Sequence, residues 1–175
     1  VIGGGGSGGG GWHKGNCNKQ GSGGGGAGGI TETEFIAQGK TTLKIIIGAG
    51  GRGTTGIGES GGYSSIFCAE QNLEVRAEGG QGGHAYDSPN PFIANGGQGG
   101  TRNGEPGTIG HAKLDQGIYC GNIGAGGSCV PYGRGGLGAW NNSGGVGETG
   151  SGGGGGTDIN GASGGDGMVA IHRIR

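Results

Sequence analysis

The chain has 175 residues, of which 58 are glycine, and its formal net charge at pH 7 is −1. Only 29% of the residues are hydrophobic, so too few side chains are present to fill the core of a conventional α/β enzyme. The near-zero charge argues against a protein that binds nucleic acid through phosphate contacts. Apolar runs such as Ile45–Ile47 fall far short of the roughly 20 residues that insert across a membrane.

Glycine-dense blocks alternate along the chain with short segments that are rich in side chains. The first blocks, residues 3–11 and 21–29, flank a polar segment at 12–20. Two segments rich in β-branched residues follow at 30–37 and 41–47. The three residues between them, Gln38-Gly39-Lys40, predict that the two segments pair as a hairpin.

Further strands are predicted at Tyr63–Phe67, Asn72–Ala77 and Met168–Ile174. The sequence Gly-Gly-Gln-Gly-Gly occurs twice, at 79–83 and 96–100, and the prolines between the two copies mark a loop. No window places apolar residues at helical spacing, so we expect almost no α-helix. The chain starts without Met and without a signal peptide, from which we expect a processed or truncated N-terminus.

Glycine makes folding costly, because it loses more backbone freedom than any other residue when it becomes ordered. Since few side chains can be buried, contacts between main chains must offset this cost. Polyglycine-II helices have three residues per turn and pack closely enough to hydrogen-bond to one another. Collagen is excluded because runs such as 152–156 break any fixed spacing of glycine. The expected fold class is therefore glycine-rich irregular or all-β: one domain, residues 1–175, formed by a bundle of polyglycine-II helices with a few short β-strands.

Two glycine motifs are better explained by structure than by ligand binding. Gly48-x-Gly50-x-x-Gly53 follows an apolar strand, but the residues after it would not begin the helix that binds a dinucleotide pyrophosphate. A single calcium-repeat-like stretch at 153–158 lacks the stacked copies that complete such a site. The histidines and cysteines show no paired metal spacing, and no motif places a catalytic nucleophile or acid–base pair. We therefore expect no enzyme activity, no cofactor and no metal.

The four cysteines, Cys17, Cys68, Cys120 and Cys129, are even in number and allow three pairings. We prefer Cys120–Cys129, which would close a small loop, and this leaves Cys17–Cys68 as the second pair. Reduced thiols are the alternative. If the bridges form, the protein functions outside a reducing cytosol. Asn141-Asn142-Ser143 is a glycosylation acceptor that has meaning only in a secreted eukaryotic protein.

The side chains best suited to recognition lie outside the glycine blocks. Aromatic residues beside amides and charges suit contacts with sugars or protein surfaces, because a rigid ring gives contact area at low entropic cost. The alternative for Trp12 and Trp140 is that they pack against the glycine bundle. The candidate binding residues are Trp12, His13, Lys14, His84, Tyr86, Asp87, Asn90, Phe92, Tyr119, Tyr132, Arg134, Trp140 and Asn141.

Taken in order, five segments covering nearly the whole chain resemble the glycine-rich domain of bacteriophage tail fibres and related adhesins. These segments are residues 1–6, 35–51, 61–66, 75–83 and 164–171. The pattern is also similar to the glycine-rich region of the anaplastic lymphoma kinase receptor family. The resemblance implies stacked polyglycine-II helices that display recognition loops from their ends. The presence of four cysteines is unusual for a phage fibre that is assembled in the bacterial cytoplasm, and it favours a secreted protein.

The expected function is that of a non-enzymatic, tail-fibre-type adhesin domain. A rigid scaffold would present loops at 12–20, 84–93 and 119–142 to a cell-surface glycan or protein, on a virion tail fibre or in another extracellular setting. The alternative is an extracellular structural subunit that self-assembles into a filament or matrix through its terminal strands. Ice or mineral binding would need a flat array of small residues, which the scattered charged and aromatic residues oppose. Neither expectation involves nucleic acid or membrane insertion.

Overall fold

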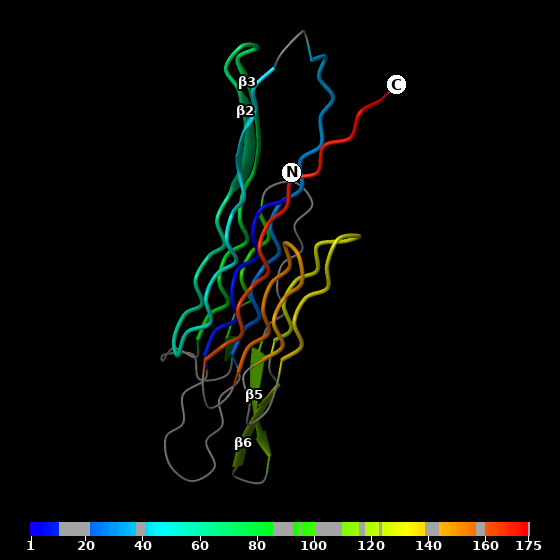
Figure 1. Ribbon diagram of the computed structural model, residues 1–175. Helices are drawn as coiled ribbons and strands as arrows, with labels where there is room; N and C mark the ends of the chain where they lie inside the picture. Colours follow the sequence, from blue (N-terminus) through cyan, green and yellow to red (C-terminus); the bar gives the residue numbers. More distant parts are fainter. Residues whose placement is uncertain are drawn as a thin grey trace.

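The computed structural model describes residues 1–10, 22–37, 41–85, 93–94, 96–100, 110–115, 118–122, 124–138, 144–156 and 160–174. This part of the chain contains six β-strands and no helix, which fits the irregular all-β class that the composition predicts. The strands form two separate three-stranded antiparallel sheets. Glycine tracts lie side by side between β2 and β3 at one end of the molecule and β5 and β6 at the other (Figure 1).

Residues 2–10, which we call the central tract, show how the glycine tracts are joined. Gly3, Gly6 and Gly9 donate their backbone N–H groups to the tract at 22–30, over donor–acceptor distances of 2.8–3.0 Å. The intervening residues donate to two other tracts, at 56–62 and 160–168. The pairs are Gly4 to Gly62, Ser7 to Glu59 and Gly10 to Gly56, and Ile2 to Met168, Gly5 to Gly165 and Gly8 to Ala162. The central tract therefore bonds to each antiparallel neighbour at every third residue.

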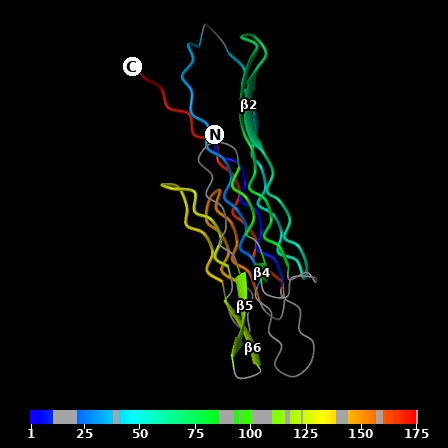
Figure 2. The ribbon, with the colours of Figure 1, turned by 180° about the vertical axis from the view of Figure 1, so that it is seen from behind.

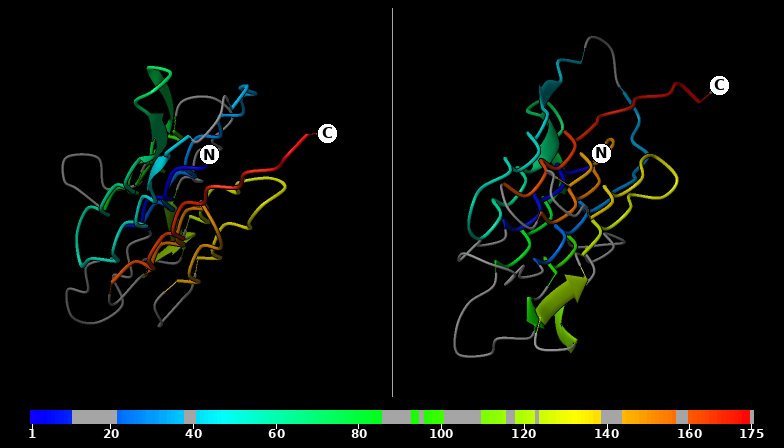
Figure 3. Two further views of the ribbon diagram at one scale, coloured as in Figure 1. Left: turned by 45° about the horizontal axis from the view of Figure 1, so that its top comes forward. Right: turned by 90° about the horizontal axis from the view of Figure 1, so that it is seen from below.

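Three more tracts, which run parallel to the central tract, donate hydrogen bonds to its carbonyl groups. They are residues 48–54, 78–85 and 150–156. The pairs are Gly51 to Gly5, Gly80 and Gly83 to Gly4 and Ser7, and Gly153 and Gly156 to Gly6 and Gly9. The central tract thus has six neighbours, and the rows of tracts around it can be followed in the view from below (Figure 3).

This packing explains why the central tract is almost pure glycine. A Cβ atom built on Gly6 would fall on the carbonyl oxygen of Gln81, and one on Gly25 would fall on that of Gly6. Backbone atoms cannot rotate away as a side chain would. Two buried serines have a hydroxyl that replaces a backbone partner: the Ser22 hydroxyl donates to the carbonyl of Gly156 at 2.7 Å, and the Ser151 hydroxyl accepts from the N–H of Cys129 at 3.0 Å.

Tracts at the surface carry side chains at every third residue, pointing away from the bundle. Arg52 and Thr55 are exposed on the tract at 48–54 and its following turn. On the tract at 78–85, Gln81 and His84 are exposed and Glu78 is half-buried. The same three-residue repeat that forms the backbone hydrogen bonds therefore sets which positions can hold a side chain.

The first sheet has the order β1-β2-β3 and consists of β1 (Lys44–Ile46), β2 (Ser64–Cys68) and β3 (Leu73–Ala77). β2 and β3 lie within one residue of the predicted strands, which are thereby confirmed. Ile66 of β2 lies opposite Ile45 and Val75, and Ile66 and Val75 are each only 5% exposed. This cross-strand row gives the sheet its apolar face.

The predicted hairpin between 30–37 and 41–47 is wrong, because β1 pairs with β2 and residues 31–37 belong to no strand. The glycine tracts that continue β1 and β2 are neighbours in the bundle. The N–H of Gly62 donates to the carbonyl of Ala49 at 2.8 Å, and the N–H of Gly48 donates to the Ser64 hydroxyl at 2.9 Å. The two strands therefore leave the bundle already side by side.

The second sheet has the order β4-β5-β6 and lies at the opposite end of the bundle (Figure 2). It consists of β4 (Ile93–Ala94), β5 (Gly110–Asp115) and β6 (Ile118–Asn122), all antiparallel. The sequence analysis predicted no strand here, and its expected loops at 84–93 and 119–142 overlap β4 and β6. β5 does alternate polar and apolar residues from His111 to Asp115, so the signal for this strand was present in the sequence and was missed.

The N-terminal end of the bundle is defined by Ile2, which bridges to Ile30 on one side and to Met168 on the other. Ile2, Ala27 and Cys129 form a small buried apolar cluster, against which Ile30 and Met168 pack. The strand predicted at Met168–Ile174 is wrong. Only Met168 is paired, and residues 169–174 form no backbone hydrogen bond with any described residue.

No disulfide is found among the described residues, which include the buried residues Cys68 and Cys129. Residues 124–128 do not form a small closed loop: Gly124 donates to Ser22 and Gly127 to Gly25, so this segment runs along the bundle. Cys17 and the side chain of Cys120 lie outside the described part of the chain, so the pairings Cys120–Cys129 and Cys17–Cys68 stay predictions.

Candidate functional site

The connecting segments that hold most candidate binding residues leave the bundle at one end, which we call the loop end. Hydrogen bonds place Gly9, Gly23, His84 and Gly156 at one level there. The N–H of Gly9 donates to Gly23, that of Gly23 to His84, and that of Gly156 to Gly9. The Ser22 hydroxyl bonds to the carbonyl of Gly156 at the same level. The described residues that flank segments 11–21, 86–92 and 157–159 therefore lie together.

A fourth segment, residues 139–143, is flanked by described residues of the same half of the bundle. The N–H of Gly145 donates to Leu137 at 2.7 Å, and the N–H of Gly154 donates to Gly145 at 3.0 Å. The tract at 133–138 runs away from the N-terminal end, and the tract at 144–148 returns toward it. The described ends of these two tracts, at Gly138 and Gly144, thus face the loop end.

The structure does not describe nine of the thirteen candidate residues. These are Trp12, His13, Lys14, Tyr86, Asp87, Asn90, Phe92, Trp140 and Asn141. Tyr119 is on β6, which lies at the loop end, and its side chain is not described. His84 is exposed at the level where its tract ends, two residues before the segment at 86–92 that carries Tyr86.

Tyr132 and Arg134 lie apart from the other candidates. The chain turns at 129–133, where the N–H of Gly133 donates to the carbonyl of Cys129 at 2.9 Å, and Cys129 packs on Ile2 at the N-terminal end. The Tyr132 hydroxyl donates to a carboxylate oxygen of Glu32 at 3.3 Å. The N–H of Arg134 donates to the Glu148 carboxylate at 2.9 Å. These contacts give both residues a structural role at the end that does not carry the loops.

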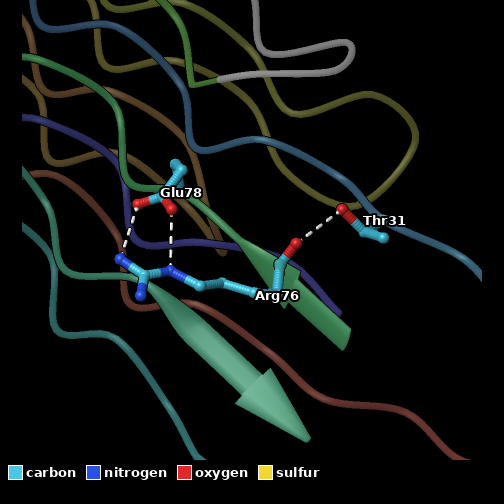
Figure 4. Close-up of polar contacts among 3 residues, drawn as sticks. All are labelled: Thr31, Arg76 and Glu78. Atoms are coloured by element: carbon cyan, nitrogen blue, oxygen red, sulfur yellow. Dashed lines mark hydrogen bonds and ion pairs between the residues drawn. The ribbon is translucent and has the colours of Figure 1, made fainter. Parts of the chain in front are cut away.

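A cluster around Arg76 joins the first sheet to the glycine bundle (Figure 4). The Arg76 guanidinium forms an ion pair with Glu78, with Nε 2.7 Å from one carboxylate oxygen and a second nitrogen 3.2 Å from the other. It also lies 3.9 Å from the centre of the Tyr63 ring, and the Arg76 carbonyl accepts a hydrogen bond from the Thr31 hydroxyl at 2.9 Å. The hydrogen bond to Glu78 raises the pKa of Arg76.

A second polar cluster surrounds Glu70 at the outer end of the sheet. Its carboxylate accepts hydrogen bonds from the Cys68 thiol at 3.4 Å and from the backbone N–H of Thr42 at 3.3 Å. Hydrogen bonds from its own backbone, then from Cys68 and Thr42, hold the pKa of Glu70 below its ordinary value. Thr42 precedes β1 by two residues and Glu70 follows β2, so the cluster links the ends of these two strands.

The structure also reveals a polar face that the sequence analysis did not predict. Neighbouring surface tracts present exposed Ser60, Gln81 and Gln98, and the N–H of Gln81 donates to the carbonyl of Gln98 at 2.9 Å. The signal was available in the sequence as the spacing of three between Glu78, Gln81 and His84. In the described part of the chain, no three His, Cys, Asp or Glu side chains come close enough to hold a metal ion. Among the same residues there is no helix with the length and apolarity to cross a bilayer.

Comparison of the sequence with models of known protein families and with curated proteins gave no match.

Proposed function

We propose that this chain is a non-enzymatic, tail-fibre-type adhesin domain, in which a rigid bundle of polyglycine-II helices displays loops that bind a cell-surface glycan or protein. The observation that carries the proposal is that the described residues flanking the segments rich in aromatic and polar residues lie together at one end of the bundle. A binding protein needs such a constellation of contacts held on a stiff support.

The scaffold half of the proposal is supported by the three-residue repeat of the hydrogen bonds. Polyglycine-II chains have three residues per turn and no internal hydrogen bonds, so each chain bonds only to its neighbours. The central tract has this character, since its N–H groups point in turn to three different neighbours. Side chains at every third position of the surface tracts agree with the same repeat.

The display half is supported by where the side chains gather. Apart from Ile2 and Cys129 at the N-terminal end, the buried residues in the described part of the bundle are glycine, serine and alanine. Segments 12–20, 86–92 and 139–143 hold two tryptophans, a tyrosine and a phenylalanine together with amides and charges. Large aromatic residues of this kind supply most of the binding energy in protein interfaces.

The proposal is tested by measuring how fluorescently labelled protein binds to intact bacterial cells. Each of the variants Trp12→Ala, Tyr86→Ala and Trp140→Ala should weaken binding by about tenfold or more, because anchor residues typically contribute 2 kcal/mol or more. Their thermal unfolding should stay at the temperature of the unchanged protein. Tyr132→Ala is the matched control, since it removes an aromatic ring at the opposite end and should leave binding unchanged.

Two outcomes would contradict the proposal. Unchanged binding in all three loop variants would show that the loops are not the binding surface. Loss of binding in Tyr132→Ala alone would move the surface to the N-terminal end. If a loop variant lost binding and unfolded at a lower temperature, its tryptophan or tyrosine would instead pack against the bundle, which is the alternative noted for Trp12 and Trp140.

The proposed location is a virion tail fibre or another extracellular setting. The alternative function is a structural subunit that self-assembles. It is favoured by one observation: the segments at 32–37 and 169–174 form no backbone–backbone hydrogen bond with the described chain.

A further inference from the structure

Two tracts lie at edges of the bundle, those at 48–54 and 133–138. In the described chain, each of them has neighbouring tracts on one side only. A polyglycine-II chain has three residues per turn, so its successive N–H groups point in three directions. In an edge tract, one direction leads into the bundle and the other two lead outward, where a further tract could be added. An open edge of this kind is a template for pairing with another chain, as the edge strand of a β-sheet is.

Side chains accept the outward N–H groups of the tract at 48–54. Its inward N–H group, at Gly51, donates to the carbonyl of Gly5 at 2.9 Å. The outward N–H groups around it donate instead to side-chain oxygens of the two flanking tracts. The pairs are Gly50 to Asp166 at 2.8 Å, Arg52 to Glu59 at 3.2 Å and Gly53 to Ser163 at 3.3 Å. This edge is therefore capped from residue 50 to residue 53.

The caps follow the three-residue repeat of the bundle. Asp166 and Ser163 are three residues apart on the tract at 160–168, and the N–H groups that they accept, at Gly50 and Gly53, are also three residues apart. Backbone hydrogen bonds join the same two tracts, so each capping side chain is held at the level of the group that it caps. The positions of the caps are therefore set by the backbone of the bundle.

The second edge tract, at 133–138, is capped in the same way. Its inward N–H group, at Gly136, donates to the carbonyl of Gly152 at 2.9 Å. Its outward N–H groups donate to Glu148 and Ser128, which lie on the chain segments on either side. The pairs are Arg134 to the Glu148 carboxylate at 2.9 Å and Gly135 to the Ser128 hydroxyl at 3.1 Å. Two separate edges thus have caps of the same kind.

We propose that these five side chains close the two edges of the bundle, so that another glycine-rich chain, including a second copy of this one, is not added sideways. An added tract would have to accept the same N–H groups, which are already bonded to carboxylate or hydroxyl oxygens. Hydrogen bonds to a carboxylate are stronger than those to a neutral carbonyl. Natural β-sheet proteins protect their edge strands with charged side chains for the same reason.

Closed edges go beyond the proposed adhesin function, because the display of loops at one end does not require them. They bear on the alternative function. A matrix that grew by adding tracts sideways is opposed at both capped edges. Self-assembly would then have to use the ends of the bundle, where the segments at 32–37 and 169–174 emerge.

The proposal is tested by opening the edge at 48–54 with the double variant Ser163→Ala/Asp166→Ala, which removes two acceptors and adds no bulk. Sedimentation velocity is measured from low micromolar to millimolar concentration. The double variant should associate at concentrations about tenfold or more below those at which the unchanged protein does, because two donors are released for pairing. Asp166→Asn is the matched control, since its amide oxygen still accepts a hydrogen bond, and it should sediment like the unchanged protein.

Amide hydrogen exchange, measured residue by residue by NMR, locates the opened edge. In dilute solution, the N–H groups of Gly50 and Gly53 should exchange about tenfold or more faster in the double variant than in the unchanged protein, because their acceptors are gone. At high concentration their exchange should slow again, as carbonyl groups of a second molecule accept them. The N–H of Gly51 donates into the bundle and is the internal control, which should exchange equally in both proteins.

Three results would overturn the proposal. They are a double variant that is no more associated than the unchanged protein, association that leaves Gly50 and Gly53 exchanging fast, and slow exchange of these two groups in the dilute variant. If the double variant unfolds more readily than the unchanged protein, Glu148→Ala applies the same two measurements to the other edge, with Arg134 as the exchanging group. None of these results bears on cell binding by the loop variants, so the two proposals fail separately.

Discussion

Ser7 and Glu59 are joined by two hydrogen bonds across neighbouring tracts. The backbone N–H of Ser7 donates to the Glu59 carbonyl at 2.9 Å, and the backbone N–H of Glu59 donates to the Ser7 hydroxyl at 2.8 Å. Ser7 is fully buried and is the only residue other than glycine among residues 3–10. Its hydroxyl therefore acts as an acceptor inside the bundle, where a backbone carbonyl would otherwise be needed.

Replacing Ser7 by alanine should destabilise the protein by about 1–3 kcal/mol, because the N–H of Glu59 loses its acceptor in a part-buried place. Urea unfolding measures the change. Ser60→Ala on the surface of the neighbouring tract is the control and should change stability by no more than about 0.5 kcal/mol. Equal effects of the two substitutions would show that the hydroxyl contributes nothing.

Adding one methyl group to a buried glycine should be more damaging. Gly25→Ala would place a Cβ on the carbonyl of Gly6, so we expect a loss of about 3 kcal/mol or more. Gly56→Ala is the matched control, because no atom lies within 4 Å of the added Cβ there. Alanine at that turn should leave stability unchanged or raise it slightly by restricting the unfolded chain. Similar stability of the two variants would contradict close packing of the tracts.

The low pKa of Glu70 predicts a pH dependence of stability. Because the pKa is lower in the folded state, its contribution is present above the ordinary carboxyl pKa and is lost as pH falls through the folded value. The difference in urea midpoint between the unchanged protein and Glu70→Gln should therefore be largest at neutral pH and shrink in acid. Glu34→Gln, at an exposed position without a hydrogen bond, should give no such trend. A constant difference at all pH values would contradict the assignment.

The thiol of Cys68 can be detected by mass spectrometry. In the folded protein Cys68 is buried and its thiol donates to the Glu70 carboxylate, so iodoacetamide should modify it slowly. After unfolding in denaturant without a reducing agent, Cys68 should gain one carbamidomethyl group. Recovery of a disulfide-linked peptide that contains Cys68 would contradict this hydrogen bond.

Strands β2 and β3 could be predicted from the sequence because their side chains determine where they form. Ser64–Cys68 and Leu73–Ala77 have the residue types of strands and a short turn between them, and both appeared within a residue of the expected bounds. Residues 30–37 have equally favourable residue types but form no strand. Only Ile30 has a bridge partner, Ile2, at the N-terminal end of the bundle. Pairing between strands here depends on which glycine tracts are neighbours, and glycine carries no side-chain information about its neighbours.

The sequence contained more information than we used about which tracts are central and which lie at the surface of the bundle. A tract with neighbours on all sides must be nearly all glycine, as residues 3–10 are, whereas a surface tract tolerates a side chain at every third position, as in Gln81 and His84. The clustering of the loops followed from neither pattern. The clustering of the loops depends on where each tract ends and the chain reverses direction. Those positions are defined by the backbone hydrogen bonds that align residues of neighbouring tracts, and these are known only from the structure.

The bridge between Ile2 and Met168 joins two segments that are far apart in the chain. The acceptors for Ile2, Gly5 and Gly8 all lie in residues 162–168. The central tract therefore cannot complete its hydrogen bonds until residues 162–168 are present, so its closure depends on distant contacts that form slowly. A chain that stops before residue 160 would leave the central tract open along one whole side.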